Sequence, residues 1–549
     1  MVHFVQFILS FLPPLALWYR PDSITWLSYT SPEPCHLTSS PNSTKSIAIV
    51  GAGSAGLGVL KAILDLPLDI RSGWEVVLYE RRRDVGGLWL PDPPGYTPNP
   101  PELPETPWYP LLRTNTPHPT MTYPHFPFAG GTTLFPPADA VQTYHADFAV
   151  HNDLTPYVRL NHTVVSAQWY GDDAQGNWYV EVQADGGGSD EVTLRRAFDH
   201  LIVASGHNSY PYIPAWNGTE DWLAGISPGV ACREILHSIY YRRPERYANR
   251  GVLIVGSGAS AFDIAVQVSP LAQVVYQSVK EGKKHASGAA VVQKPAISHF
   301  TRDSVVFVDG TAVTDVDAVI LGTGYELRIP FLSAPHSSVL LADADTRANS
   351  TTAGILTSNL RYLFPLHRQI FSLASNLPPT ALGFIGLPSL ASSCPLYLAQ
   401  GIFVAHTLAN SSLLPTREDM VRELVAREER LRARGYDPYR VGHKLLASEN
   451  ETEDYQDELI AYLKHRGALP ENGKPYVDSW RRMEWGYAVF LYRGWRRIQA
   501  LDDEQRWLNG VETEEQWVDM MDRIVNWERK WEEGHSAESI PIDFYVETY

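Results

Sequence analysis

The sequence predicts an α/β protein with two parallel-sheet domains, the second inserted into the first, and a helical C-terminal region. Three observations predict this fold. Two apolar strands, about 200 residues apart, each run into a glycine-rich turn and a helix; further apolar strands end in small residues; and the tail after residue 475 is charged and rich in tryptophan. With 549 residues, of which 44% are hydrophobic and 19% charged, the chain is long enough for more than one globular domain.

The first glycine-rich turn follows the apolar strand 47–50 and reads Gly51-Ala52-Gly53-Ser54-Ala55-Gly56. In this Gly-x-Gly-x-x-Gly spacing, Gly51 permits a tight turn, Gly53 lets the backbone approach a pyrophosphate, and Gly56 lets the helix pack closely on the strand. The amides at the helix start then bind the phosphates. The turn predicts a Rossmann-like dinucleotide site; the alternative is an ordinary strand, turn and helix without a ligand.

A carboxylate supports the dinucleotide interpretation. The next strand, residues 75–79, ends at Glu80, which is placed to hold a ribose hydroxyl. Glu80 lies 29 residues after Gly51, more than the usual spacing of about 20, and the polar stretch 69–73 accounts for the excess. Just beyond it, the segment Gly86-Gly87-Leu88-Trp89 offers close backbone approach at its glycine pair and a flat apolar wall at its tryptophan.

The second glycine-rich turn follows the strand 252–255 and reads Gly256-Ser257-Gly258-Ala259-Ser260-Ala261, with Ala261 in the third glycine position. The next strand, residues 273–277, runs into Ser278 and Lys280 instead of an acid. A hydroxyl and a cation suit the 2′-phosphate of NADP better than the 2′-hydroxyl of NAD. The alternative is that Lys280 belongs to a solvated loop.

The remaining chain supplies further strands and helices. Apolar strands at 200–206, 317–325 and 381–387 end in small residues, as expected where a ligand binds at the edge of a parallel sheet. Strand 317–325 is expected to return the chain to the first domain. Alternating runs predict an antiparallel meander, and a hairpin is expected at 305–310. The other expectations are a helix over 137–150, meander strands at 157–169, 177–184 and 191–196, a helix with Gln400 near its start, and a helix over 417–434 capped by Thr416.

Composition excludes several classes of function. The net charge is −17 and no basic block occurs, which argues against nucleic-acid binding. Cys35, Cys232 and Cys394 are far apart, and the absence of a Cys-x-x-Cys pair excludes a zinc ribbon and a dithiol redox centre. We therefore expect neither a metal site nor a disulfide reductase.

Two interpretations of the N-terminus stay open. Residues 1–18 are mostly apolar, but they are short for a spanning helix, and neither a preceding basic residue nor a clear cleavage site marks a signal peptide. They form either a membrane contact or secretory signal, placing the protein at the endoplasmic reticulum, or a disordered leader of a cytoplasmic protein. Residues 19–44, rich in Ser, Thr and Pro, are interpreted as a linker. The sequence does not predict an oligomeric state.

These motifs together resemble the flavin-containing monooxygenase family, of the N- and S-oxygenating type found in fungi, from about residue 45 to 435. The resemblance implies an FAD-binding domain at 45–230 and 318–435, an NADP-binding domain at 231–317, and a helical cover at 436–549, after the leader and linker at 1–44. It implies FAD and NADPH as cofactors. The cofactor-binding residues expected are Gly51, Gly53, Ser54, Ala55, Gly56, Glu80, Gly87, Leu88, Trp89, Thr114, Asn115, Val164, Ser205, Gly206, Gly256, Ser257, Gly258, Ser260, Ala261, Ser278, Lys280, Thr323 and Gly324.

The chemistry implied by the resemblance belongs to the flavin. NADPH reduces FAD, the reduced flavin captures O2 as a C4a-hydroperoxide, and a nitrogen or sulfur atom of a small molecule attacks the distal oxygen. Asn115 matches the family asparagine and is expected to stabilise the peroxyflavin by hydrogen bonding. The substrate is expected to be a natural-product intermediate. The alternatives are Baeyer–Villiger oxygenation, an uncoupled NADPH oxidase, and a non-catalytic flavin-binding protein.

One family fingerprint, F-x-G-x-x-x-H-x-x-x-[F/Y], is only partly kept. His237 and Tyr241 fit it, whereas Ala231 replaces the aromatic residue and Arg233 replaces the glycine. Since this segment joins the two domains near NADP in the family, the departure bears on hinge behaviour and NADP retention. Baeyer–Villiger relatives usually carry tryptophan at the place of Tyr241, so N- or S-oxygenation is favoured.

Overall fold

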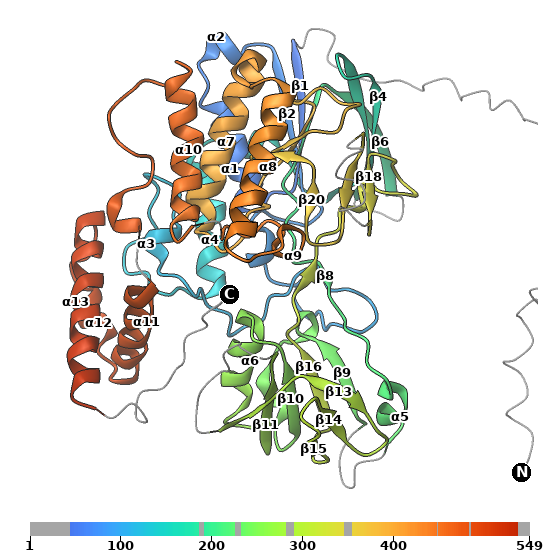
Figure 1. The fold of residues 1–549 in the computed structure, drawn as a ribbon. Coiled ribbons are helices and arrows are strands. Elements are labelled where there is room, and N and C mark those ends of the chain that lie inside the picture. The colour runs from blue at the N-terminus through green and yellow to red at the C-terminus, as the bar shows by residue number, and fades with distance from the viewer. Residues whose placement is uncertain are drawn as a thin grey trace, which may run out of the picture. The chain divides into compact units, whose positions relative to one another are not determined.

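The computed structural model describes residues 44–185, 191–225, 232–280, 290–344, 354–446, 448–482 and 485–535. A seven-stranded sheet forms the first domain (Figure 1), and its strand order is β21-β22-β23-β7-β1-β2-β3. The central strand β1 runs parallel to β2 and β7, with Ile47 opposite both Val76 and His200. The strands are β1 (Lys45–Val50), β2 (Trp74–Tyr79), β3 (Val158–Arg159), β7 (His200–Val203), β21 (Leu366–His367), β22 (Phe371–Ser372) and β23 (Leu382–Phe384).

Both faces of β1 are covered, which explains why the strand is apolar throughout. Ile47 and Ile49 face a helical layer, whereas Ala48 and Val50 face the antiparallel meander (Figure 1). The meander β4-β5-β6 is confirmed, and Trp178 at its buried face donates a hydrogen bond to the Ala381 carbonyl (2.7 Å). The helices are α1 (Ser54–Leu64), α4 (Ala138–His151), α7 (Ser393–Ala409), α8 (Arg417–Ala433) and α10 (Glu451–His465), and the meander strands are β4 (His162–Gly171), β5 (Gly176–Asp185) and β6 (Glu191–Phe198).

Helices α1 and α7 are in close contact at a pair of glycines. A Cβ on Gly401 would lie 2.9 Å from the Cα of Val59 and 3.0 Å from the carbonyl oxygen of Gly58.

Gln400 lies in the middle of α7, not near its start as expected. Its buried amide accepts from the Gly386 amide (3.0 Å) and donates to the Tyr455 hydroxyl (2.9 Å), which fixes the end of β23 to two helices.

A second, five-stranded parallel sheet has the order β12-β11-β10-β16-β9. One expectation is corrected here: the strand at 318–321 does not return the chain to the first domain but pairs with β10 in the second sheet, with Val252 opposite Ala318. This wholly buried apolar strand needs a partner on each edge, and it has β10 and β9. The chain leaves only afterwards, along a two-stranded ribbon of β17 and β8. The elements are β9 (Glu234–His237), β10 (Gly251–Val255), α6 (Ala259–Val268), β11 (Val274–Ser278), β12 (Val291–Lys294), β16 (Ala318–Leu321), β17 (Tyr325–Glu326) and β8 (Tyr210–Pro211).

The C-terminal region is helical, as predicted. Its tryptophans pack rather than form a platform: Trp495 and Trp517 are buried in one apolar cluster with Met520 and Ile524. A capping box formed by Thr513 and Gln516 starts the last helix. The elements are η7 (Ser479–Arg481), α11 (Trp485–Ala500), α12 (Glu504–Leu508) and α13 (Glu514–Glu533).

Short elements connect these layers. The predicted hairpin around 305–310 is confirmed as part of a three-stranded sheet, β13-β14-β15. The remaining elements are α2 (Leu68–Arg71), η1 (Gly87–Trp89), α3 (His118–Met121), η2 (Thr155–Tyr157), α5 (Thr219–Leu223), η3 (Ser238–Tyr240), η4 (Pro244–Tyr247), β13 (Ile297–Phe300), β14 (Val305–Phe307), β15 (Ala312–Val313), η5 (Pro330–Leu332), β18 (Leu340–Ala342), β19 (Leu356–Ser358), β20 (Leu363–Phe364), η6 (Ser411–Leu413) and α9 (Pro438–Val441).

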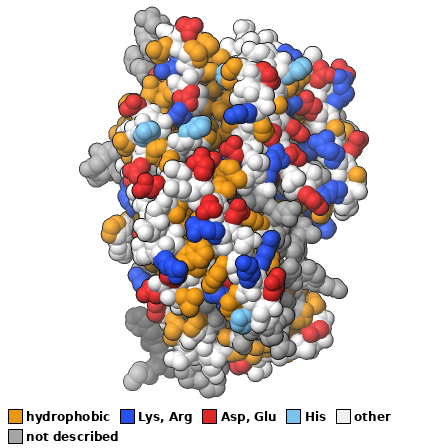
Figure 2. Space-filling view, turned by 90° about the vertical axis from the view of Figure 1, so that its left-hand side faces the viewer, with side chains coloured by type: hydrophobic (Ala, Val, Ile, Leu, Met, Phe, Trp, Pro, Cys, Tyr) orange, Lys and Arg blue, Asp and Glu red, His pale blue; other side chains and the backbone are white. Residues whose placement is uncertain are grey.

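The surface shows mixed charge. On the face in Figure 2, acidic and basic side chains lie among apolar ones and do not gather into a block of one sign. Over the described ranges, no helix has the length and apolar character that a membrane span requires. The expectations for residues 1–43 lie outside the described residues.

Candidate cofactor sites

The first glycine turn is built where the ends of β1, β2 and β7 meet. Gly51 has a φ of +104°, and a Cβ there would lie 2.6 Å from the carbonyl oxygen of Ala204. A Cβ on Gly56 would lie 1.8 Å from the carbonyl oxygen of Gly51. Both positions therefore require glycine, for the turn and for the close packing of α1. Ser205 and Gly206, at the end of β7, are exposed beside this turn.

A second glycine segment lies against the first. A Cβ on Gly53 would be 3.4 Å from the Cα of Gly87, and the Gly86 amide donates to the Ala52 carbonyl (3.0 Å). Leu88 and Trp89 follow in η1. Because Gly53 precedes α1 and has no side chain to cap it, the first amides of the helix can bind an anion.

Glu80 lies at the same turn. Its Oε2 accepts from the Ala52 amide (2.7 Å) and its Oε1 from the Arg82 amide (2.9 Å), and the residue is 5% exposed. Burial raises the pKa of Glu80, and the two amides act in the opposite direction. Each carboxylate oxygen keeps a lone pair that can accept a ribose hydroxyl. The structure thus brings together the glycines and the carboxylate that the sequence predicted.

Sequence reasoning missed Arg82. Its buried guanidinium donates to the carbonyls of Gly87 (2.9 Å) and Leu90 (2.9 Å), so it fixes the second glycine segment beside the end of β2. The only signal is its place in a run of three arginines that directly follows Glu80, and that run does not indicate which guanidinium turns inward.

Asn115 lies on a loop, and the structure does not bring it into contact with the glycine turn. Its side chain is exposed, whereas Thr114 is buried and donates from its hydroxyl to the Thr116 carbonyl (2.8 Å). Val164 lies on β4, buried opposite Val182 in the meander. The cofactor contacts expected of Thr114, Asn115 and Val164 stay predictions.

In the second glycine turn, alanine takes the third glycine position because a glycine lies opposite it. Gly256 has a φ of +121°, and a Cβ there would lie 2.3 Å from the carbonyl oxygen of Gly322. Gly322, at the end of β16, faces Ala261, whose methyl would lie 2.5 Å from a Cβ on Gly322. The glycine opposite makes room for the alanine. Ser257, Gly258 and Ser260 lie at the uncapped start of α6.

The two predicted phosphate ligands after this turn, Ser278 and Lys280, differ in exposure and in hydrogen bonding. Ser278 is buried and its hydroxyl donates to the Pro295 carbonyl (2.8 Å), so it must rotate before it can donate to a phosphate. Lys280 is exposed at the end of the described segment. Lys280 is therefore the stronger of the two candidates for the 2′-phosphate.

His237 fixes the small residues Thr323 and Gly324 at the end of the predicted strand 317–325. Its Nδ1 accepts from the Ile239 amide (3.1 Å), which leaves the proton on Nε2, and Nε2 donates to the Gly324 carbonyl (3.0 Å). Burial lowers the pKa of His237 to about 4, so the ring is neutral. The neighbouring Thr323 donates from its hydroxyl to the Tyr212 carbonyl. The Thr323–Gly324 turn is thus fixed at the end of β16.

A family model described as flavin-binding monooxygenase-like matches residues 44–287 and 283–470. The chain belongs to this family. It is 27% identical to the flavin-containing monooxygenase FMO GS-OX-like 2 of Arabidopsis thaliana over 487 residues, covering 85% of this chain and 92% of that protein. It is 27% identical to the flavin-containing monooxygenase ustF2 of Aspergillus flavus over 499 residues, covering 78% and 93%.

Solved structures share the fold. The S-allyl-L-cysteine S-oxygenase of Allium sativum superposes with a TM-score of 0.64 at 24% identity, covering 89% of this chain and 99% of that one. Tmm of Pelagibacter sp. strain HTCC7211 gives a TM-score of 0.60 at 20% identity, covering 80% and 88%. The protein is therefore a flavin-dependent monooxygenase that uses FAD, NADPH and O2 and acts on a small molecule.

The two turns fit the cofactors of a flavin-containing monooxygenase. The first offers a helix start for the pyrophosphate of FAD, glycine backbone on two sides, and the Glu80 carboxylate for a ribose. The second offers a helix start and Lys280 for NADPH. FAD, once bound and reduced, supplies the oxygen chemistry, and the protein supplies binding, orientation and shielding.

The departure from the family fingerprint is accommodated within the second domain. The Arg233 guanidinium donates to the carbonyls of Trp222 (3.0 Å) and Arg302 (2.5 Å) and lies over the Trp222 ring. Arg233 is thus a buried packing residue. Ala231 lies outside the described residues.

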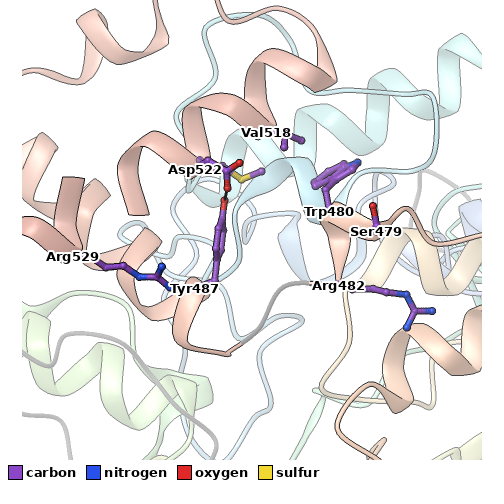
Figure 3. A pocket seen from close by; sticks show the side chains of 8 residues that line it. Ser479, Trp480, Arg482, Tyr487, Val518, Asp522 and Arg529 are labelled. Carbon is purple, nitrogen blue, oxygen red and sulfur yellow. Dashed lines mark hydrogen bonds between the residues drawn. The ribbon is translucent and has the colours of Figure 1, made fainter. Parts of the chain in front are cut away.

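A separate cavity of about 320 Å³ lies in the C-terminal region (Figure 3). Several of its polar groups already have partners: the Tyr487 hydroxyl donates to Asp522 (2.8 Å), and Arg482 forms ion pairs with Asp454 and Asp457. None of its lining residues belongs to the predicted cofactor set. The lining residues are Ser479, Trp480, Arg482, Tyr487, Val518, Met521, Asp522 and Arg529.

Lys280→Ala is expected to reduce the preference for NADPH over NADH by about 10-fold or more, because a charge-assisted hydrogen bond to the 2′-phosphate is lost. The measurement is kcat/KM for each nucleotide in the flavin-reduction step. Lys530→Ala, which removes an exposed lysine on α13, is the matched control and should leave the preference unchanged. An unchanged preference in Lys280→Ala means that other groups hold the phosphate.

Proposed function

We propose that this monooxygenase oxygenates a soft nucleophile, the nitrogen or sulfur atom of a small molecule, as a tailoring step on a natural product. The residue that favours N- or S-oxygenation over Baeyer–Villiger oxygenation is Tyr241. Its buried hydroxyl donates to Gln267 of α6 (2.9 Å), and its ring meets Tyr109 edge-on at 5.2 Å. The phenol is thus built into the linker at the place where Baeyer–Villiger relatives usually carry tryptophan.

The protein's own residues have three tasks in this proposal. The amides of α1 bind the FAD pyrophosphate and Glu80 holds a ribose, which fixes the cofactor. The exposed amide of Asn115 donates a hydrogen bond to the reacting oxygen. Leu88 and Trp89 give the site an apolar wall that keeps water from the reacting atoms.

The test of the proposed function is a product assay. The FAD-loaded protein is given NADPH, O2 and one of three probes: a tertiary amine, a thioether or a cyclic ketone. We expect the amine or thioether to gain one oxygen atom, with about one NADPH oxidised per product. An inserted oxygen in the ketone alone indicates Baeyer–Villiger chemistry, and H2O2 as the sole product with every probe indicates an oxidase; either result overturns the proposal.

Asn115→Asp is expected to lower product formation by about 100-fold, because it removes the donor without changing the size of the side chain. NADPH oxidation should continue and end in H2O2. FAD content should stay at the wild-type level, since the Asn115 side chain is exposed and carries no packing. Asn526→Asp, on the exposed face of α13, is the matched control. Normal product yield in Asn115→Asp removes Asn115 from the catalytic role.

A further inference from the structure

The C-terminal extension, residues 479–482 and 485–535, lies beyond the residues that the family model matches. Its helices α11 and α13 pack together through Leu491, Trp495, Met520 and Ile524, all fully buried. Gly494 permits this contact, since a Cβ there would lie 2.7 Å from the Cγ2 of Ile524. The extension is therefore a folded helical hairpin with its own apolar core.

This core continues into the first domain. Leu134 and Phe135 belong to the same buried cluster as the extension, and the Phe135 ring meets Tyr492 edge-on at 5.1 Å. Both residues lie on a return arm, residues 133–138, that runs beside the Asn115 loop, residues 112–119. The extension thus packs directly against the arm behind that loop.

Polar and aromatic contacts join the extension to both the Asn115 loop and the return arm. Arg481, 10% exposed, donates to the Pro119 carbonyl (2.7 Å) and to Glu514 (3.2 Å). The ring of His118 meets Trp517 edge-on with a centroid distance of 4.4 Å. On the return arm, the Trp495 indole donates to the Thr133 hydroxyl (3.2 Å).

Two backbone hydrogen bonds connect the return arm to the loop on either side of Asn115. The Thr114 amide donates to the Pro136 carbonyl (3.0 Å), and the His118 amide donates to the Leu134 carbonyl (2.9 Å). Asn115 therefore has a backbone fixed at both ends, and the fixing arm is itself held by the extension.

We propose that the C-terminal extension positions Asn115, with Arg481 and Trp517 as positioning residues. A surface loop with few buried contacts opens readily, and the extension supplies the buried contacts that this loop and its return arm need. The effect on catalysis rests on the role given to Asn115 under the proposed function. The effect on the loop does not depend on that role.

The test compares two arginines of the extension. Arg481 and Arg493 are similarly buried and each pairs with a glutamate, Glu514 and Glu532. Arg481 also lies 3.9 Å from Asp478 at the start of its own short helix, and of the two arginines it is the one that donates to Pro119. Amide hydrogen exchange is measured in FAD-loaded Arg481→Met and Arg493→Met, together with H2O2 released per NADPH oxidised. In Arg481→Met we expect exchange of residues 112–119 to rise about 10-fold while α1 is unchanged, and H2O2 release to rise several-fold at normal FAD content. Arg493→Met should match the wild type.

Two outcomes overturn the proposal. Unchanged exchange of the loop in Arg481→Met overturns it, and so does an equal rise in Arg493→Met, since the extension then acts only on overall stability. If Arg481→Met does not fold, Trp517→Phe, which keeps the packing apolar but withdraws the indole from His118, is scored by the same criteria. A wild-type protein that oxygenates no amine or thioether overturns the proposed function, and the exchange comparison then still decides the positioning.

Discussion

The Gly53→Ala protein is expected to fold normally and to bind FAD at least about 100-fold more weakly, a loss of about 2.7 kcal/mol. The backbone tolerates the change: Gly53 has a φ of −79°, which any residue adopts, and the added Cβ would lie 3.4 Å from the Cα of Gly87, the limit of ordinary contact. The methyl group instead occupies the surface by which the turn must approach the pyrophosphate.

Two other glycines separate ligand loss from misfolding. Gly130→Ala should bind FAD like the wild type, since a Cβ there meets no described atom within 4 Å. Gly51→Ala should lower the free energy of unfolding by about 1–3 kcal/mol or more, because its φ is +104° and the Cβ would lie 2.6 Å from the Ala204 carbonyl oxygen. The measurements are FAD titration by flavin fluorescence and thermal unfolding of the apoprotein. Wild-type FAD affinity in Gly53→Ala contradicts the assignment of this turn to the pyrophosphate.

The local elements of the fold were predictable because each depends on neighbouring residues. Four apolar residues before a glycine turn specify a buried strand and the start of a helix in any context, and both turns have this pattern. The partner of a strand is different. Strand 318–321 has the same apolar run and small-residue end in either sheet, and its place is set by distant residues. Arg250 fixes it by donating to Asp317 and to Glu234 of β9, both at 2.6 Å.

The site shows the same division. Residues that bind through their backbone, such as Gly51 and Gly53, follow from spacing alone. Residues that act through distant carbonyls do not: Arg82 holds Gly87, and Gln400 holds the amide of Gly386. Nor could the sequence show that the Ser278 hydroxyl already donates to Pro295. These contacts arise only when the sheets and loops are assembled.

Acidification below pH 6.5 is expected to destabilise the protein through buried histidines. His118, His145 and His237 are each at most 2% exposed, and burial lowers their pKa values to about 3, 4 and 4. The hydrogen bonds of His145 suit the neutral ring: Nδ1 donates to the Val141 carbonyl and Nε2 accepts from the Ser54 hydroxyl, both at 2.7 Å. A proton on Nε2 would prevent the Ser54 hydroxyl from donating there, so the hydroxyl would have to rotate and accept instead, at the start of α1.

The sign follows from proton uptake. In the unfolded chain a histidine has a pKa of about 6.5, above the folded value, so between pH 6.5 and 4 the unfolded state binds more protons. The stabilisation is complete above pH 6.5 and is lost as the pH falls toward the folded pKa. At pH 5 the loss is roughly 2 kcal/mol per histidine. The pKa values of Glu80, Asp263 and Glu453 are raised by burial, and these carboxyls act in the opposite direction.

A variant isolates the histidine contribution from that of the carboxyls. His145→Gln keeps an acceptor for Ser54 but cannot take up a proton, so its free energy of unfolding should fall below the wild-type value at pH 7.5. The difference in free energy of unfolding between the variant and the wild type should then shift by about 2 kcal/mol in favour of the variant between pH 7.5 and pH 5. Urea unfolding at both pH values measures this difference. His125→Asn is the control, because His125 is exposed and its φ of +64° suits asparagine. Parallel pH dependences for His145→Gln and the wild type would show that the folded protein admits a proton at His145, and the Ser54 contact could then not require a neutral ring.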